Sequence, residues 1–346
     1  MTTYETHFVS EVLSERHGLE RLGLSDGSRA YNLTQLTGRV IPGDRVVVNT
    51  TAVELGLGTG GWHIVHWNLS NASLNTRSGG HIMKMRYTSL QTDTGSFEEL
   101  YEQTFNDPHA EPGEALHSVP VIVCSLHSQM AAAAIAFHHA SPDARLVFVM
   151  TDGASLPLAM SDVVAELRER EVVSATVTCG HAFGGDAEAV NVASGLGAAV
   201  RVHRADAIVV SMGPGVVGTG TALGTTALEV VDIVAWAHRL GGRPVLALRG
   251  SHDDPRPRHQ GISHHSLTAL GFLRASLTPV TIAVAEGDTA LLPDVECESY
   301  DVSAAMPLFD APPRITTMGR DVRGDPLFFR LSAAAGLAAA HMLQRL

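Results

Sequence analysis

Residues 119–151 read VPVIVCSLHSQMAAAAIAFHHASPDARLVFVMT, and this stretch decides the fold class. Its ends, residues 119–126 and 145–150, are rich in Val, Ile, Leu and Phe, as in strands that are buried on both faces of a parallel sheet. Residues 129–140 between them have the length and composition of a helix. A strand, a helix and a second buried strand form the repeating unit of an α/β domain.

The same alternation continues toward the C-terminus. We predict four further strands at 172–178, 205–212, 243–248 and 279–285, and four further helices at 156–170, 187–197, 225–240 and 264–275. Six buried strands joined by five helices predict a doubly wound, mostly parallel, Rossmann-like sheet within residues 119–290. We expect residues 291–346 to be an extension that ends in a helix, beginning at Leu327, packed on this core.

The first hundred residues follow a different pattern. Short β-rich runs such as 29–33, 44–49 and 62–67 are separated by glycine and proline turns. Such spacing is typical of a small β-barrel or sandwich, so we predict a β-barrel-like domain over residues 1–105. Residues 106–118 are rich in turn-forming dipeptides, and we expect them to be a connector.

Composition and charge exclude several classes of protein. The 346-residue chain has 24 Lys+Arg against 36 Asp+Glu, a net charge of −12 with histidine neutral. Strong binding to phosphate backbones needs many basic side chains, so we expect no nucleic-acid partner. The N-terminal residues do not resemble a secretory signal, and no 18 apolar residues are contiguous, so we expect a cytoplasmic protein with no membrane partner. Three widely spaced cysteines predict no disulfide framework.

Ligands of open α/β sheets bind beyond the carboxyl ends of the strands, so the residues that follow each predicted strand are the candidates. The segment after the fifth predicted strand, residues 249–265, holds four His, two Asp and three Arg within 17 residues. Turns and helix caps alone do not require that composition. We therefore predict a ligand-binding or active site at this edge of the sheet, with a small anionic metabolite as the partner.

The side chains of this segment support two interpretations. Imidazoles and carboxylates can bind a divalent metal that activates water, and the candidate ligands are His252, Asp254, His259 and His264. Alternatively, a histidine acts as general acid or base while guanidinium groups hold an anionic substrate. The catalytic candidates are His252, His259, His264, Asp186 and Lys84, and Arg249, Arg256 and Arg258 are the candidates for binding the anion. We expect at most one of the adjacent His264 and His265 to face the site.

A glycine-rich segment follows the fourth predicted strand. Gly213, Gly215 and Gly218 match the dinucleotide fingerprint G-x-G-x-x-G, but Arg249 stands where that fingerprint expects an acidic residue. We favour a loop that binds a phosphate or carboxylate through its amides and the hydroxyls of Thr219 and Thr221. Nicotinamide or flavin binding and simple close packing of the glycines are the alternatives. The remaining predicted ligand-binding residues are His127, Asp152 and His81.

Lys84 is the only lysine among 24 basic residues. Lysine has a compact amine that can lose its proton, so this position is a candidate for chemistry that a guanidinium cannot perform. A lysine retained by chance would look the same in the sequence. A β-hairpin that carries Lys84 would lean over the sheet edge as a lid and complete a site between the domains.

Several motifs together resemble one known family. They are residues 49–52 (NTTA) with 55–61 (LGLGTGG), 80–84 (GHIMK) with 86–88 (RYT), 184–186 (GGD) with 188–191 (EAVN), 213–215 (GPG) with 217–221 (VGTGT), and 258–259 (RH) with 261–265 (GISHH). The chain resembles a bacterial family known only as a domain of unknown function, numbered thirty-eight sixty-six, over nearly its whole length. The resemblance implies a cytoplasmic bacterial protein, and it brings no assigned substrate, cofactor or catalytic residue.

We therefore predict an enzyme, a hydrolase or transferase, that acts on a small anionic or phosphorylated metabolite at the carboxyl edge of the sheet. The rival hypothesis is a non-catalytic ligand-binding sensor or scaffold whose barrel recognises a protein partner. A nicotinamide- or flavin-dependent oxidoreductase is a third. The cofactor stays unknown, with a divalent metal as the candidate, and a homo-oligomer is compatible with the sequence.

Overall fold

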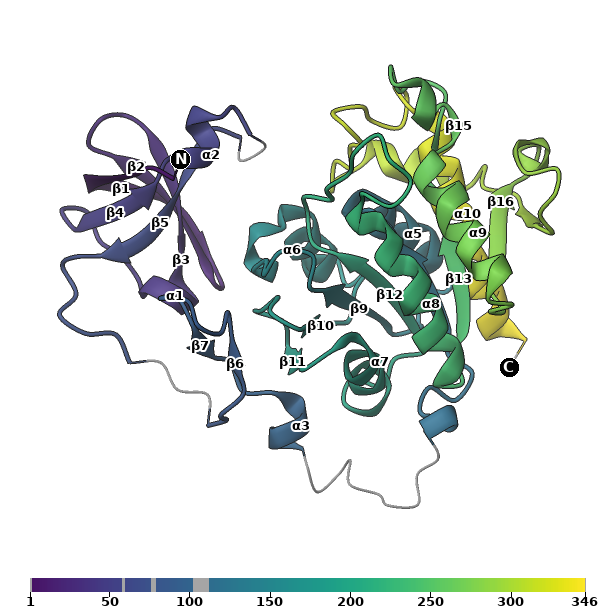
Figure 1. The fold of residues 1–346 in the computed structure, drawn as a ribbon, viewed down its shortest axis with the longest axis horizontal. Helices are drawn as coiled ribbons and strands as arrows, with labels where there is room; N and C mark the ends of the chain where they lie inside the picture. Colours follow the sequence, from purple (N-terminus) through teal and green to yellow (C-terminus); the bar gives the residue numbers. More distant parts are fainter. Residues whose placement is uncertain (1, 58–59, 76–78, 102–111, 346) are drawn as a thin grey trace. The chain divides into compact units, whose positions relative to one another are not determined.

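Two sheets of different construction organise the chain (Figure 1). The structure is a computed structural model that describes residues 2–57, 60–75, 79–101 and 112–345. Within it the chain forms two units, residues 1–95 and residues 96–346, and each has its own core. The predicted connector falls partly on residues 106–111, which lie outside the described residues, as do Gly58 and Thr59 of the glycine-rich motif at 55–61.

The first unit is a closed five-stranded barrel, which confirms the β-barrel-like prediction. Its strands neighbour one another in the order β1 (Tyr4–Arg16), β2 (Leu19–Leu24), β3 (Arg29–Leu33), β5 (Trp62–Asn68) and β4 (Arg45–Asn49), and β4 pairs with β1 to close the barrel. β3 and β5 run parallel, and the other pairs are antiparallel. This connectivity is that of a small Greek-key barrel of the OB-fold kind. Leu22, Val46, Val48 and Val65 belong to the group of apolar side chains that fills the interior.

Local sequence explains how the barrel strands turn and pair. Gly18, between β1 and β2, has a φ of 78°, a conformation that costs a glycine little. On β3 and β5 the rings of Tyr31 and Trp62 stack with their centroids 4.8 Å apart, and the guanidinium of Arg29 lies 4.5 Å from the Trp62 ring centre. Such cross-strand pairs hold neighbouring strands in register. The unit also contains α1 (Thr34–Thr37), α2 (Thr51–Glu54) and the paired strands β6 (Met83–Lys84) and β7 (Thr92–Asp93).

The second unit contains an eight-stranded, all-parallel sheet, which confirms the α/β prediction. The order is β11 (Ala187–Ala189), β10 (Ala175–Cys179), β9 (Leu146–Thr151), β12 (Ala207–Met212), β8 (Pro120–Cys124), β13 (Arg243–Ala247), β16 (Thr281–Ala285) and β17 (Glu298–Tyr300). The six predicted strands correspond to β8, β9, β10, β12, β13 and β16, and the two edge strands were not predicted. β11 lies where the sequence predicts the start of a helix, and that start is wrong. The helix begins at Val192 instead, because the side chain of Asn191 accepts a hydrogen bond from the Ser194 amide and caps it.

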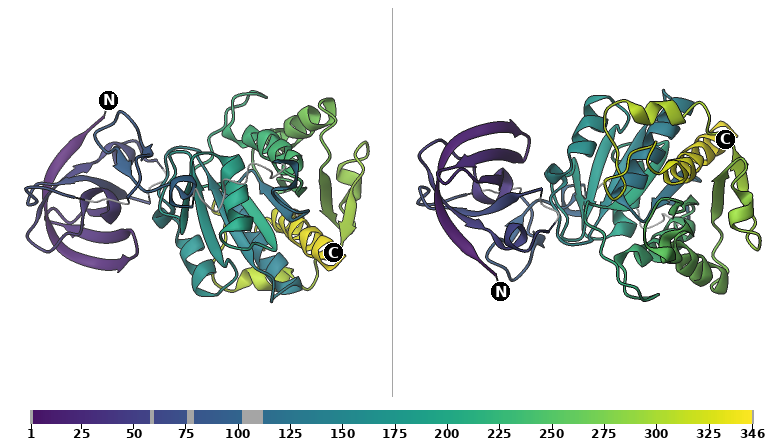
Figure 2. Two further views of the ribbon diagram at one scale, coloured as in Figure 1. Left: turned by 90° about the horizontal axis from the view of Figure 1, so that it is seen from below. Right: turned by 90° about the horizontal axis from the view of Figure 1, so that it is seen from above.

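Helices cover both faces of this sheet (Figure 2). α5 (His127–Ala140), α6 (Asp162–Glu169) and α10 (Pro326–Gln344) pack on one face, and α7 (Val192–Arg201), α8 (Glu229–Arg239) and α9 (His264–Ala275) pack on the other. Successive strand residues alternate between the two cores: Ile122 and Cys124 face the first group of helices, and Val121 and Val123 the second. The strands are therefore apolar on both faces, which is why they read as continuous apolar runs in the sequence.

The alanine-rich helices α5 and α10 pack very closely together. A Cβ added at Gly336 would lie 2.2 Å from the carbonyl oxygen of Ala133, so this position of α10 has no room for a side chain. By length and hydropathy alone α10 could cross a membrane, but 67% of the apolar window is buried inside the unit. The C-terminal residues thus supply a core helix together with edge strand β17.

The carboxyl ends of the parallel strands meet at one edge of the sheet. β9 and β12 are neighbours there, and their outgoing chains lead to helices on opposite faces, α6 and α8. Such a divergence is a topological switch point, the kind of place where doubly wound folds bind ligands, and the neighbours β12 and β8 diverge in the same way toward α8 and α5. The remaining short elements are α3 (Phe97–Leu100), β14 (Gly250–Ser251), β15 (Gly261–Ile262) and the 3₁₀ turns η1 (Pro112–Glu114), η2 (Leu158–Met160), η3 (Thr226–Leu228), η4 (Pro257–His259), η5 (Thr289–Leu291) and η6 (Met306–Asp310).

Candidate functional site

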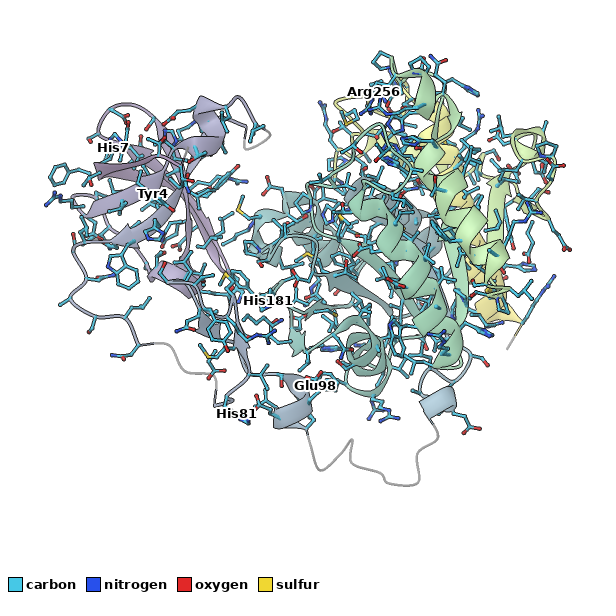
Figure 3. The ribbon with its side chains drawn as sticks, in the orientation of Figure 1. Tyr4, His7, His81, Glu98, His181 and Arg256 are labelled. Atoms are coloured by element: carbon cyan, nitrogen blue, oxygen red, sulfur yellow. The ribbon has the colours of Figure 1, made fainter. Side chains whose placement is uncertain are left out.

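The long segment after β13 folds back on itself at the carboxyl edge. β14 pairs antiparallel with β15, with Ser251 opposite Gly261, so the two ends of the segment lie side by side. The amide of Ser263 donates to the carbonyl of Arg249 at 2.8 Å, and the amide of Arg249 donates to the Ser266 hydroxyl at 2.9 Å. These bonds close residues 252–260 into a loop directly before α9, and Figure 3 labels Arg256 within it.

Three histidines meet where this loop joins α9. The ring centroids of His264 and His265 are 4.1 Å apart, and those of His259 lie 5.0 and 5.2 Å from them. One nitrogen from each ring lies within 4.8 Å of the others, an arrangement that can hold a metal ion. The expectation that at most one of His264 and His265 faces the site is therefore wrong. Both belong to the first turn of α9, where side chains tilt toward the helix N-terminus and so toward His259 on the incoming chain.

The polar atoms of the three rings are unequally satisfied. Nδ1 of His259 lies 2.8 Å from the Ser263 hydroxyl, and both side chains are buried. Nε2 of His264 and Nε2 of His265 are buried and have no hydrogen-bond partner. A buried nitrogen without a partner costs roughly 1–3 kcal/mol. Two such atoms on adjacent rings make this position a candidate ligand site.

The three imidazoles are neutral at pH 7. Burial, together with the charges of Arg249 and Arg256, lowers the pKa of His259 to about 3. Burial, together with His264, lowers the pKa of His265 to about 4, and burial with Arg258 lowers the pKa of His264. Neutral imidazole is the form that coordinates metals, whereas a general base at pH 7 works best with a pKa near 7. The rings are therefore better suited to binding than to proton transfer.

An ionic network around the buried side chain of Asp254 supports the loop beside the histidines. Asp254, 1% exposed, accepts from Nε of Arg256 at 2.8 Å and from its Nη2 at 2.7 Å, a two-pronged contact. Nη2 atoms of Arg249 and Arg320 lie 3.5 and 3.6 Å from the same carboxylate. The hydrogen bonds from Arg256 hold the pKa of Asp254 well below its usual range. Its oxygens are thus engaged by cations, and Asp254 does not join the metal-ligand group formed by the three histidines.

The network carries more positive than negative charge. Arg320 also donates to Asp325 at 3.0 Å, and Asp325 accepts from the Ser251 hydroxyl at 2.8 Å. Counting Arg249, Arg256 and Arg320 against Asp254 and Asp325 leaves 3 − 2 = +1. Burial lowers the pKa of Arg249 to about 10, so its side chain, 7% exposed, stays charged at pH 7. A chain of net charge −12 therefore has a locally cationic site.

The glycine-rich loop touches the histidine cluster. A Cβ added at Gly218 would lie 2.7 Å from Cε1 of His265, so the close approach requires glycine. The loop does not lead directly into a helix: Gly218 pairs with Thr225, and α8 begins at Glu229. The hydroxyls of Thr219 and Thr221 are exposed and 2.8 Å apart. This hairpin lacks the strand–glycine–helix geometry of a dinucleotide site, which removes the basis for the nicotinamide or flavin alternative.

Glu229 lies beside the carboxyl ends of β9 and β12. The Thr151 hydroxyl lies 2.9 Å from both of its carboxylate oxygens, and burial raises the pKa of Glu229 to about 7. The backbone of Met212, where the glycine-rich loop begins, also hydrogen-bonds this carboxylate. Sequence reasoning missed Glu229, since an acidic residue at a helix start is expected for the helix dipole alone. The one indication in the sequence is that Glu229 follows the fourth predicted strand and the glycine-rich loop after that strand.

Other predicted site residues have structural surroundings. Nε2 of His127 lies 2.7 Å from the Ser161 hydroxyl and its Nδ1 lies 3.3 Å from the Met212 carbonyl, so both ring nitrogens are engaged. Asp152 accepts from the amides of Ser155 and His181 at 2.9 and 2.8 Å, and so ties two carboxyl-edge loops together.

Asp186 does not lie at the carboxyl edge, and that expectation is wrong. Its carboxylate accepts from the Thr176 amide at 2.8 Å and pairs with Arg168 at 3.0 Å, near the start of β10. The chain after β10 must return toward the start of that strand, because β11 pairs with β10 in parallel from Val177 onward.

The remaining predicted residues are dispersed. His252 is exposed and does not belong to the group of three histidines, and Arg258 is exposed on η4. Lys84, which is buried, and His81, which is exposed, lie in the first unit. The prediction that they complete a site with the second unit stays a prediction. Arg320 and Asp325 were not predicted, because nothing in the sequence links them to a loop some sixty residues earlier.

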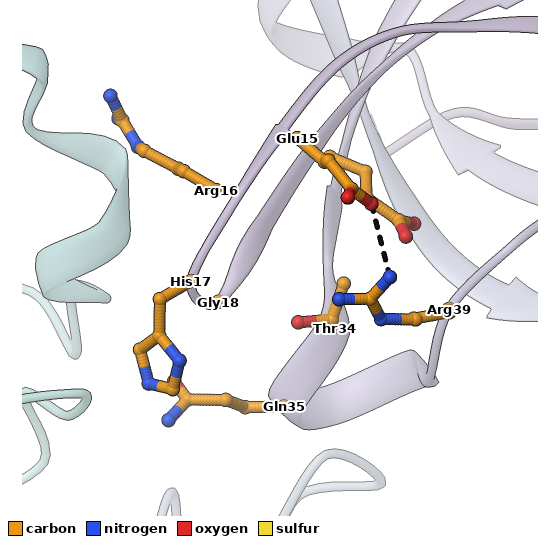
Figure 4. Close-up of a pocket in the computed structure, with 8 residues that line it drawn as sticks. Glu15, Arg16, His17, Gly18, Thr34, Gln35 and Arg39 are labelled. Carbon is orange, nitrogen blue, oxygen red and sulfur yellow. Dashed lines mark hydrogen bonds and ion pairs between the residues drawn. The ribbon is translucent and has the colours of Figure 1, made fainter.

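Two pockets are lined by other residues. One, of about 210 Å³, opens on the barrel at the turn between β1 and β2 and is bordered by the ion pair of Arg39 and Glu15, 3.0 Å apart (Figure 4). The other, of about 390 Å³, is a largely apolar groove beside the C-terminal end of α9, lined by Leu270, Leu273 and Leu277. The histidine and arginine side chains are a better indicator of function than these hollows, because they supply groups that can bind and react.

A family model described as a protein of unknown function (DUF3866) matches residues 29–336. No curated protein and no solved structure matches.

Proposed function

Since the chain belongs to this family of unknown function, we propose from the site alone that it is an enzyme, a hydrolase or transferase, acting on a small anionic metabolite at the carboxyl edge of the sheet. The observation that carries the proposal is the excess positive charge of this ionic network, in which Arg249 is buried, beside three neutral histidines. A buried cation without full compensation is costly, so an anionic partner stabilises it. We favour a phosphorylated substrate because guanidinium groups match phosphate geometry.

The arginines divide into supporting and binding groups. Arg256 uses two donors on Asp254, so it anchors the network. Arg249 approaches Asp254 at 3.5 Å, beyond normal hydrogen-bond length, and keeps donors for an anion. Arg258 is exposed at the same loop and its charge acts on His264. Arg249 and Arg258 are therefore the side chains we assign to the substrate anion.

Glu229 is the group best suited to proton transfer. Its pKa of about 7 makes both protonation states available near neutral pH. It borders the glycine-rich loop at Met212, and the same loop contacts His265 at Gly218. We propose that Glu229 acts as general acid or base on a substrate held along this loop.

Phosphate binding provides the first test. Isothermal titration with inorganic phosphate and a panel of phosphorylated metabolites should detect binding that Arg258→Ala weakens by about 10–100-fold, the value of a charged hydrogen bond. The matched control is Arg274→Ala, an exposed arginine at the far end of α9. Equal affinities for the two variants would contradict the assignment of Arg258.

Turnover provides the second test. Release of phosphate, or its transfer to an acceptor, should occur with a ligand from that panel and should fall at least about 100-fold in Glu229→Gln. Saturable binding without turnover would instead favour the sensor hypothesis.

A further inference from the structure

We propose that His259, His264 and His265 together bind one divalent transition-metal ion, with Zn²⁺ as the expected occupant. This inference goes beyond the proposed function, because the three side chains can bind a metal whether or not a substrate is present. Three imidazole ligands and one open position form the ligand set of a catalytic zinc site, in which the metal supplies a Lewis acid.

The distances fit this site. The ligand nitrogens lie within 4.8 Å of one another. A zinc–nitrogen bond of about 2.1 Å in tetrahedral geometry places such nitrogens about 3.4 Å apart. Metal binding therefore requires the widest pair to close by at most about 1.4 Å, a movement on the scale of side-chain rotation.

The hydrogen bonds leave the lone pairs in the required places. When Nδ1 of His259 donates to the Ser263 hydroxyl at 2.8 Å, its Nε2 keeps a lone pair for the metal. Metal-binding histidines characteristically have such a partner on the second nitrogen, which fixes the ring. Nε2 of His264 and Nε2 of His265 are buried without partners, and His265 is 6% exposed. One metal ion would satisfy both orphaned atoms.

The fold supports the three ligands from two sides. Ser263 caps α9, so it positions His264 and His265 on the first helical turn while its hydroxyl orients His259. Gly218, in the glycine-rich loop, lies close to the His265 ring on the other side. Apolar side chains at these positions would pack without leaving any nitrogen unsatisfied, so packing alone does not explain three histidines here.

The surrounding arginines add a consequence that rests on the proposed function. Arg249 and Arg258 act electrostatically on His264 and His265, so they repel a bare cation. A phosphate at the open position would interact favourably with both the metal and these arginines. Metal and phosphate should therefore bind cooperatively, and the coupling must be equal in both directions.

Cobalt substitution tests the metal site without any activity assay. Co²⁺ added to the metal-stripped full-length chain should bind one per chain and produce the visible absorption of nitrogen-coordinated cobalt, and Zn²⁺ should displace it. His264→Ala and His265→Ala should each weaken binding at least about 100-fold. His252→Ala is the matched control, an exposed histidine in the same loop, and should bind cobalt like the parent chain.

The variants separate a lost ligand from a lost fold. His264 is only partly buried, so its removal should leave the melting temperature of the stripped protein nearly unchanged while abolishing its increase on adding Zn²⁺. Failure to bind cobalt in the parent chain, or equal cobalt binding by His264→Ala and His252→Ala, would overturn the metal site.

Phosphate titrations with and without Zn²⁺ distinguish this inference from the proposed function. Binding of phosphate that is at least about fivefold tighter with the metal supports the coupling. Metal binding without any phosphate binding refutes the proposed function and leaves the metal site standing. Phosphate binding by a chain that binds no metal refutes the metal site and leaves the proposed function standing.

Discussion

Replacing Glu229 with glutamine should change the pH dependence of stability. The carboxyl is nearly isosteric with the amide, and its pKa is raised from 4.5 to about 7 by burial. Below about pH 3.5, Glu229 is largely protonated in both the folded and the unfolded chain, so its ionisation does not affect the free energy of unfolding. As the pH rises toward 7 the unfolded chain loses this proton while the folded chain keeps it, so the folded state is progressively destabilised.

The size of this effect follows from the shift. A difference of 7 − 4.5 = 2.5 between the two pKa values corresponds to about 3 kcal/mol at about 1.4 kcal/mol per unit. The Gln variant does not ionise, so it avoids this cost. We expect the Gln variant to be up to about 3 kcal/mol more stable than the parent at pH 8 and indistinguishable from it below about pH 3.5.

Denaturant unfolding at a series of pH values measures this difference. Trp236 lies in α8, the helix that begins at Glu229, and with Trp62 and Trp67 changed to Phe its fluorescence reports on the second unit alone. Glu169→Gln, at an exposed position in α6, is the control and should leave the pH profile unchanged. Parallel profiles for the parent and Glu229→Gln between pH 5 and 8 would refute the reasoning.

Two further substitutions test the loop and the network. Gly218→Ala places a methyl group 2.7 Å from Cε1 of His265, so cobalt titration should show binding weakened at least about 10-fold. The loss of stability should be small because the loop is exposed. Unchanged cobalt affinity would show that the contact between Gly218 and the His265 ring is not tight. Asp254→Asn leaves buried Arg249 and the partly exposed Arg256 and Arg320 without their shared carboxylate. It should lower the free energy of unfolding by about 1–3 kcal/mol, whereas exposed Asp253→Asn should not.

The class of the fold could be predicted from local patterns. Buried parallel strands are apolar on both faces, so β8, β9, β12 and β13 stand out as continuous runs of Val, Ile, Leu and Ala. Edge strand β11 is three residues long and lies just before the cap of α7, so its sequence could not be distinguished from the start of a helix.

The sequence by itself determined the two kinds of sheet, the edge at which polar side chains gather, and the segment 249–265 that carries most of them, because each depends on residues near one another in the chain. Only the tertiary structure decided which of those side chains meet. It brought Arg320 and Asp325 to Asp254, Gly218 to His265 and Thr151 to Glu229, and it carried Asp186 away from the carboxyl edge. These contacts depend on loop paths and burial, and burial also sets the pKa of Glu229, a property that no spacing of residues reveals.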